Sequence, residues 1–197
     1  MVYKKYIKRI LDILLALVVL PFVLVVCLIF GILIFAEDRG DIFYIANRRG
    51  RNGSVFGMYK LRSMKMNAPD IRNKDNSTFN SSDDPRVTKI GKIMRKASID
   101  ELPQIFNILK GDMSWIGPRP NQPSKNYNDM NDKEKERLSI RPGVTGYSQA
   151  YFRNSISQDE KLIKDLYYVN NISFLLDSKI VLQTIKSVLF QENINTN

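Results

Sequence analysis

Two adjacent carboxylates, Asp100 and Glu101, are the residues of this sequence whose types and spacing best suit chemistry. Carboxylates can act as nucleophiles, and they can hold a divalent metal ion. The local pattern offers a simpler interpretation, because Asp is a favoured N-cap residue and apolar residues recur at helical spacing over 102–109. With Asp100 as N-cap, Pro103 falls in the first turn, where proline is tolerated. Taken alone, this stretch favours a helix start over a reacting pair.

The amino-acid composition excludes several common kinds of catalytic site. The chain of 197 residues contains no histidine, which excludes Ser-His and Cys-His nucleophile pairs and His-ligated zinc from this sequence. Its single cysteine, Cys27, lies within an apolar run and is expected to pack there as an inert thiol. Catalytic groups must therefore come from Asp, Glu, Lys, Tyr or Ser. A divalent metal would need oxygen ligands, which suits Mg²⁺ or Mn²⁺.

The chain is strongly basic. Thirty Lys and Arg against twenty Asp and Glu give a formal net charge of +10. This excess indicates an anionic partner, which could be nucleic acid, acidic lipid or a phosphorylated substrate. The length fits one domain of ordinary size.

An apolar segment near the N-terminus predicts membrane association. Residues 13–36 carry no charged side chain, and a helix of this length could cross a hydrocarbon core. Pro21 lies near the middle, where it removes a backbone donor and kinks or breaks the helix. Both flanks are basic, so the positive-inside rule assigns no orientation. The residues alone leave two arrangements open: a kinked spanning helix, or a hairpin that bends at Pro21 and leaves by the face it entered.

The composition after residue 36 becomes that of a polar globular protein. Segments 42–46 and 55–61 predict two strands around a Gly/Asn turn, with Lys60 and Arg62 on one face of the second strand. Segment 66–86 is rich in Asn, Asp and Ser and predicts a loop.

Three further segments carry helix or site signals. Residues 86–98 predict a basic helix that either lies on an anionic membrane surface or presents a solvated face, and both remain open. Residues 157–190 predict two amphipathic helices that separate near Asn170 and Asn171, followed by a polar tail expected to be disordered. Arg119 stands between prolines in a stiff loop, and arginine suits a bidentate phosphate contact.

The motifs of this chain resemble those of the bacterial sugar transferases, specifically the small monotopic phosphoglycosyl transferases that act on polyprenyl phosphate. The resemblance covers nearly the full length, and its most specific part is DPRVTKIGKIMRKASIDELPQIFNILKGDMSWIGPRP at 84–120. The other matching stretches are KRILD at 8–12, YKLRSM at 59–64, RPGVTGYSQA at 141–150 and DLYYVNNISFLLDSKI at 165–180.

The resemblance implies an α+β fold that is mostly helical, with a small β-hairpin. It implies a re-entrant helix-break-helix over residues 1–36 that turns at Pro21. A cytoplasmic catalytic domain with interfacial amphipathic helices would follow over 37–190, and a disordered tail over 191–197. This places the protein on the bacterial inner membrane, with its catalytic domain facing the cytoplasm.

The resemblance also implies an activity, that of a UDP-sugar:polyprenyl-phosphate sugar-1-phosphate transferase. A UDP-sugar would donate sugar 1-phosphate to polyprenyl (undecaprenyl) phosphate, with release of UMP, as the first membrane step in assembling a glycan or glycoconjugate. The partners would be the donor, the acceptor and membrane lipid, with no nucleic acid. The sugar, the glycan pathway and the oligomeric state are not predicted.

The resemblance also implies roles for individual residues, according to their positions in the matching motifs. Asp100 would be the nucleophile that forms an aspartyl-phosphosugar intermediate, and Glu101 would hold Mg²⁺ as cofactor. A helix beginning at Asp100 would add its positive dipole end to the phosphate site. The residues expected to bind substrate, the first four as a diphosphate clamp, are Lys60, Arg62, Arg86, Arg119, Gln149 and Arg153.

One departure from the family pattern concerns specificity. After Gln149 the family commonly has Val-x-Gly-Arg, whereas this chain has AYFRN, so Phe152 stands in place of glycine. The resemblance therefore does not predict the local backbone conformation or the surface that faces the sugar. Asp165 and Tyr168 match a late motif, and support or substrate contact would fit them equally.

A different class of function would also explain part of the sequence. A non-catalytic, membrane-anchored basic protein that binds nucleic acid or anionic lipid would explain the charge and the apolar segment. It gives no reason for Asp-Glu-Leu-Pro so close to Gly-Pro-Arg-Pro.

Overall fold

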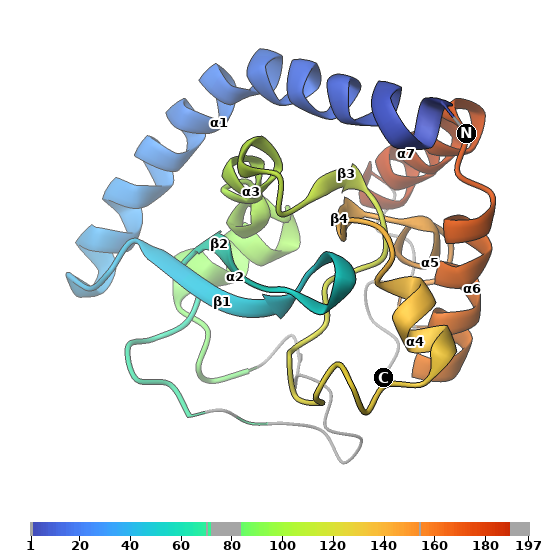
Figure 1. The fold of residues 1–197 in the computed structure, drawn as a ribbon. Coiled ribbons are helices and arrows are strands. Elements are labelled where there is room, and N and C mark those ends of the chain that lie inside the picture. Colours follow the sequence, from blue (N-terminus) through green and yellow to red (C-terminus); the bar gives the residue numbers. More distant parts are fainter. Residues whose placement is uncertain (1, 70, 72–83, 154, 190–197) are drawn as a thin grey trace. The chain divides into compact units, whose positions relative to one another are not determined.

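The computed structural model describes residues 2–69, 71, 84–153 and 155–189 (Figure 1). It is a mixed structure of helix and sheet, as predicted. The expected tail over 191–197 and most of the expected loop over 66–86 lie outside the described residues. The elements in chain order are a π-helical turn Tyr3–Ile7, α1 Lys8–Asp38, β1 Phe43–Arg49, a 3₁₀ turn Arg51–Gly53, β2 Val55–Leu61, α2 Lys89–Lys96, a 3₁₀ turn Ile99–Glu101, α3 Gln104–Lys110, β3 Ser114–Ile116, α4 Asp132–Arg137, β4 Gly143–Thr145, α5 Tyr147–Tyr151, α6 Gln158–Asn170 and α7 Phe174–Leu189.

The predicted hairpin and the two C-terminal helices are confirmed. β1 and β2 form one two-stranded sheet, and α6 ends at Asn170 before α7 begins at Phe174. A second, parallel sheet of β3 and β4 was not expected. Strands of three residues show no periodicity, and this pair depends on a close backbone approach. A Cβ at Gly143 would lie 2.1 Å from the backbone N of Gly117.

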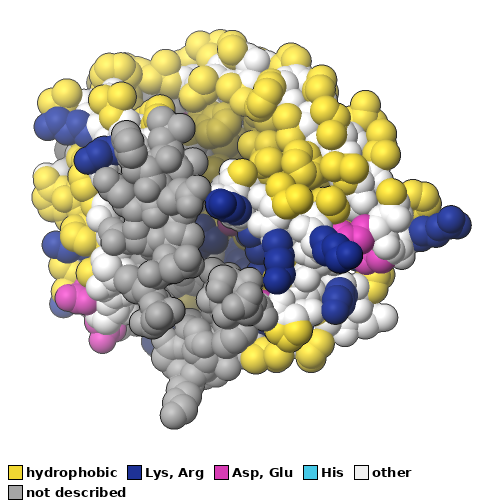
Figure 2. Space-filling view, turned by 180° about the vertical axis from the view of Figure 1, so that it is seen from behind, with side chains coloured by type: hydrophobic (Ala, Val, Ile, Leu, Met, Phe, Trp, Pro, Cys, Tyr) yellow, Lys and Arg dark blue, Asp and Glu magenta, His cyan; other side chains and the backbone are white. Residues whose placement is uncertain are grey.

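The apolar N-terminal segment forms one long helical stretch. It spans Tyr3–Asp38, 36 residues, and is long and apolar enough to cross a membrane by length and composition. Only 17% of its most apolar window is buried. Pro21 lies inside α1 and does not interrupt it, so the expected break is not visible as a gap between two helices. Many exposed side chains are apolar (Figure 2), and those of α1 include Leu14, Val18, Phe22, Leu28 and Ile32.

The chain forms two compact units. Unit 1 contains Met1–Leu20, Ala46–Met58 and Gln104–Asn197, whereas unit 2 contains Pro21–Ile45 and Tyr59–Pro103. The boundary within α1 falls immediately before Pro21. Asp100 and Glu101 therefore belong to unit 2.

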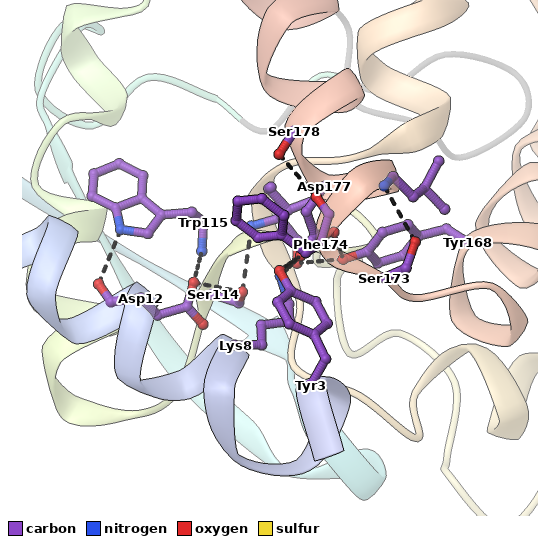
Figure 3. Close-up of polar contacts among 12 residues, drawn as sticks. Tyr3, Lys8, Asp12, Ser114, Trp115, Tyr168, Ser173, Phe174, Asp177 and Ser178 are labelled. Atoms are coloured by element: carbon purple, nitrogen blue, oxygen red, sulfur yellow. Dashed lines mark hydrogen bonds and ion pairs between the residues drawn. The ribbon is translucent and has the colours of Figure 1, made fainter. Parts of the chain in front are cut away.

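Unit 1 packs the first turns of α1 against its C-terminal helices. α5 packs against both α6 and α7, and α4 packs on α6 (Figure 1). Asp177 of α7 accepts hydrogen bonds from the hydroxyls of Tyr3 (2.6 Å) and Tyr168 (2.7 Å) and an ion pair from Lys8 (2.8 Å), as Figure 3 shows. Buried Asp177 thus joins three side chains from two parts of the sequence.

A second buried carboxylate fixes the next turn of α1. Oδ1 of Asp12 accepts hydrogen bonds from the Ser114 hydroxyl (3.0 Å) and the Trp115 backbone N–H (3.1 Å) (Figure 3). The Asp12 carbonyl accepts the Trp115 indole N–H at 3.1 Å. The start of the apolar helix is therefore bound to β3 through polar groups.

Unit 2 packs α2 directly on the backbone that follows β2. Thr88 caps α2 by accepting from the Gly91 N–H at 2.9 Å, and its own N–H donates to the Ser63 carbonyl at 3.1 Å. A Cβ at Gly91 would lie 2.0 Å from that same carbonyl oxygen. Only glycine permits this approach without a backbone shift.

Gly91→Ala is therefore expected to destabilise unit 2. Overpacking of this kind typically costs about 1–3 kcal/mol, because the added methyl group must push α2 away from Ser63. The midpoint of thermal unfolding in detergent would measure the loss. Lys96→Ala, an exposed site on the same helix, is the matched control. Equal midpoints for the two variants would contradict the packing described.

Candidate active site

Asp100 lies in the 3₁₀ turn Ile99–Glu101, after Ser98 in a left-handed conformation with φ 56°. The helix α3 begins only at Gln104. The expectation that Asp100 caps this helix is therefore wrong, and so is the dipole argument that rested on it. Pro103 has no N–H to donate within a helix, and the regular helix starts directly after it.

The carboxylate of Asp100 is buried, with 8% of the residue exposed. Burial raises its pKa above the usual value, and the charge of Glu101 raises it further, while Lys60 and Arg95 act in the opposite direction. Among the described residues, no other side chain forms a hydrogen bond or ion pair with it. A raised pKa makes this carboxylate a better nucleophile than an exposed aspartate, and no ion pair occupies it.

Glu101 and Lys60 form an ion pair beside it. Nζ of Lys60 lies 2.7 Å from Oε1 of Glu101, and the two side chains are 17% and 19% exposed. β2 supplies Lys60, and the 3₁₀ turn supplies both acids. The structure thus brings together three of the predicted site residues in unit 2.

Arg62 has its partners within the chain. Its Nη atoms each lie 2.5 Å from one carboxylate oxygen of Asp38, and its Nε donates to the Asp41 carbonyl. Nη1 also donates to the Met64 carbonyl at 3.2 Å. These contacts tie the end of α1 to the strand that carries Lys60. A role in binding diphosphate stays a prediction.

Arg86 has a similar arrangement with Asp84. Its Nε and Nη2 donate to the Asp84 carboxylate at 2.9 and 2.6 Å, and Nη1 donates to the Pro69 carbonyl at 2.8 Å. Asp84 is almost fully buried, and the arginine beside it lowers the pKa of this carboxyl. Both arginines therefore balance a carboxylate of the chain itself, and the place of Arg86 in a diphosphate clamp stays a prediction.

The remaining predicted residues lie in unit 1. Arg119 is exposed between the buried Pro118 and Pro120, in a loop that Gly143 holds by donating to the Pro118 carbonyl at 3.0 Å. Gln149 has a buried Oε1 with no hydrogen-bond partner among the described residues, which leaves an acceptor for a ligand donor. Their roles as substrate-binding residues stay predictions.

The departure at Phe152 does not strain the backbone. Phe152 adopts φ −125°, which any residue tolerates, and Arg153 next to it takes φ 46°. The role of Arg153 in substrate binding stays a prediction. Phe152 also joins an aromatic cluster that the sequence did not reveal, with ring centroids 4.9 to 6.4 Å apart among Tyr147, Tyr151, Tyr167 and Phe152.

Asp165 and Tyr168 support the fold. Asp165 is 2% exposed and accepts from Arg137 at 2.7 Å and from the Ser148 hydroxyl at 2.6 Å. Tyr168 is 1% exposed and donates to Asp177. Of the two roles open for this late motif, the structure favours support.

Arg95 is a residue that sequence reasoning missed. It lowers the pKa of Asp100 through its charge, and its Nε donates to the Ser63 hydroxyl at 3.0 Å. The only signal available was its position five residues before Asp100 in a basic helix.

The described residues contain no group of three or more His, Cys, Asp or Glu side chains around one point. Mg²⁺ in phosphoryl-transfer sites commonly binds one or two carboxylates, substrate phosphates and water. The adjacent Asp100 and Glu101, whose charges repel each other, fit that donor set.

Comparisons with known proteins identify the family of this chain. The sequence profile of the family described as bacterial sugar transferase matches residues 3–191. The galactosyl transferase CpsE of Streptococcus agalactiae serotype III is 46% identical over 78% of this chain, and the match covers 36% of that protein. The UDP-N-acetylgalactosamine-undecaprenyl-phosphate N-acetylgalactosaminephosphotransferase of Aeromonas hydrophila is 40% identical over 93% of this chain and 44% of its own length.

A third relative is of similar size. The uncharacterised sugar transferase EpsL of Bacillus subtilis is 37% identical over 95% of this chain and 89% of its own length. The chain thus spans less than half the length of the first two relatives and most of the third.

Proposed function

Because the chain belongs to the bacterial sugar transferase family, we propose that it transfers sugar 1-phosphate from a UDP-sugar to polyprenyl phosphate and releases UMP. The observation that carries this proposal is a buried Asp100, whose carboxylate has no side-chain partner among the described residues, beside the Lys60–Glu101 ion pair. The name of the Aeromonas relative, with its UDP-sugar donor and undecaprenyl phosphate acceptor, supports the same class of reaction.

The reaction takes two displacement steps at one phosphorus atom. In the first, a carboxylate oxygen of Asp100 attacks the phosphorus bonded to the sugar, and the bond to the bridging oxygen breaks. UMP leaves with that electron pair, and an aspartyl-phosphosugar acyl phosphate remains. In the second, a phosphate oxygen of polyprenyl phosphate attacks the same phosphorus and frees Asp100. An ionised aspartate needs no histidine base for the attack.

The surrounding charges lower the repulsion between a carboxylate and a diphosphate. Lys60 and Arg95 already oppose the negative charge at Asp100. Glu101 would hold Mg²⁺, which would neutralise charge on the diphosphate when bound. Lys60 then keeps Glu101 oriented through its 2.7 Å ion pair.

The membrane placement is also part of the proposal. α1 is proposed to enter and leave the inner membrane by its cytoplasmic face, with Pro21 at the turning point and the catalytic groups on that side. The basic residues on both flanks of α1 support it, because each flank is then retained in the cytoplasm. A water-insoluble acceptor explains why the reacting carboxylates are tied to a bilayer.

Asp100→Asn is expected to reduce UMP release by roughly a thousandfold or more, because an amide cannot attack phosphorus. The assay follows UMP from a panel of UDP-sugars with undecaprenyl phosphate and Mg²⁺ in detergent. Asp129→Asn, an exposed site, is the matched control and should retain full activity. Substantial turnover by Asp100→Asn would contradict the nucleophile assignment.

Lys60→Gln is expected to move the acid limb of the pH–rate profile to higher pH. Lys60 lowers the pKa of Asp100, so its loss raises that pKa, and a higher pH is then needed to ionise the nucleophile. The profile of kcat/KM against pH measures the shift, with Lys96→Gln as control. A limb that stays in place or moves to lower pH would count against this electrostatic role.

Both flanks of α1 are expected on the same side of the membrane. Single cysteines at Lys5 and Ser54, introduced in a Cys27→Ser background, should react with an impermeant maleimide in inverted vesicles and be protected in intact spheroplasts. Labelling of the two positions from opposite sides would show that α1 spans the bilayer.

A further inference from the structure

Unit 2 contains a cavity of about 710 Å³ at the end of α1. Its walls include the acids Glu37, Asp38 and Asp84 and the lysines Lys65, Lys89 and Lys92. Neither Asp100 nor Glu101 lines it.

Each acid in the wall already has a partner. The Glu37 carboxylate accepts the backbone N–H groups of Lys89 and Ile90 at 2.7 and 3.1 Å. Asp38 is bound by Arg62, and Asp84 by Arg86. These carboxylates therefore attract little further positive charge.

The three lysines differ from the acids in this respect. All three side chains are exposed, and no ammonium group among them forms a hydrogen bond or ion pair with a described residue. Three unpaired ammonium groups around one cavity form a site for an anion, and a phosphate with two negative charges matches it best.

The cavity also lies beside an apolar surface. The last turns of α1 expose Ile32, Leu33 and Phe35, and Met66 and Val87 line the cavity wall. A ligand with a phosphate head and a hydrocarbon chain would place the head among the lysines and the chain along α1. A water-soluble nucleotide would make no use of this surface.

We propose that the cavity formed by Lys65, Lys89 and Lys92 binds the phosphate head of a membrane lipid whose hydrocarbon chain lies along α1. Two sources share this chemistry, the polyprenyl phosphate acceptor and an anionic phospholipid. Identification with the acceptor rests on the proposed function, whereas binding of a lipid phosphate does not.

The test is equilibrium binding to the full chain in neutral detergent, measured by native mass spectrometry. Undecaprenyl phosphate and phosphatidylglycerol are titrated separately. The variant Lys65→Ala/Lys89→Ala/Lys92→Ala should weaken binding of at least one of these lipids about tenfold. The matched control, Lys96→Ala/Lys133→Ala/Lys179→Ala, removes the same charge outside the cavity and should change the affinity by less than about twofold.

Two further variants keep the test independent of folding. Lys65→Arg/Lys89→Arg/Lys92→Arg retains the charge and should bind as the natural chain does. The single change Lys92→Ala should weaken binding by about two- to threefold. A loss confined to undecaprenyl phosphate identifies the occupant as the acceptor, and one confined to phosphatidylglycerol identifies it as a phospholipid.

Unchanged affinity of the cavity variant for both lipids would overturn the proposal, as would an equal loss in the control. A loss of UDP-sugar binding with both lipid affinities intact would also overturn it. Binding is measured without turnover, so an absence of transferase activity would refute the proposed function and leave the lipid result standing.

Discussion

Two carboxylates, one at each end of the uncharged stretch of α1, attach this apolar helix to the polar remainder of the protein through hydrogen bonds and an ion pair. Asp12 is bound by Ser114 and Trp115 in unit 1, and Asp38 is bound by Arg62 in unit 2. A hydrogen bond to a charged group typically contributes about 1.5–3 kcal/mol, so these contacts resist separation. Arg62 directly follows β2, and β2 carries Lys60, so the attachment of α1 is linked through one strand to the charges around Asp100. The membrane helix is in this way part of the structure that holds the candidate site.

The chemistry proposed for Asp100 depends on a balance of opposing effects. Burial and Glu101 raise its pKa, while Lys60 and Arg95 lower it. An aspartate so placed is basic enough to attack phosphorus and still has cations nearby to receive an anionic substrate. This arrangement accounts for a chain without histidine, and a non-catalytic basic protein would not require it.

The sequence predicted the elements whose patterns are local. Alternation identified the β1–β2 hairpin, helical spacing identified α6 and α7, and hydropathy identified α1. It did not predict the β3–β4 pair, because three-residue strands depend on the close approach of Gly117 and Gly143. The prediction that a helix starts at Asp100 was wrong. It relied on the preference of Asp for N-cap positions, which does not reveal that Ser98 adopts a left-handed conformation before a 3₁₀ turn.

The motif residues Lys60, Asp100 and Glu101 lie close together in the structure, yet the motif gave no sign of the partners of two arginines. Asp38 lies 24 residues from Arg62 in sequence, and a positive charge alone does not show whether its partner is a substrate or a distant carboxylate. The same limit applied to Asp165, whose partner Arg137 is 28 residues away. Non-local ion pairs are thus the part of this site that required a structure.

The central claim is a covalent aspartyl-phosphosugar on Asp100. Intact-protein mass spectrometry after brief incubation with the UDP-sugar and Mg²⁺ but no acceptor tests it most directly, under conditions that preserve acyl phosphates. The account predicts an added mass equal to one sugar phosphate, mapped to Asp100 and absent from Asp100→Asn. An unmodified protein that still releases UMP once acceptor is added would contradict it.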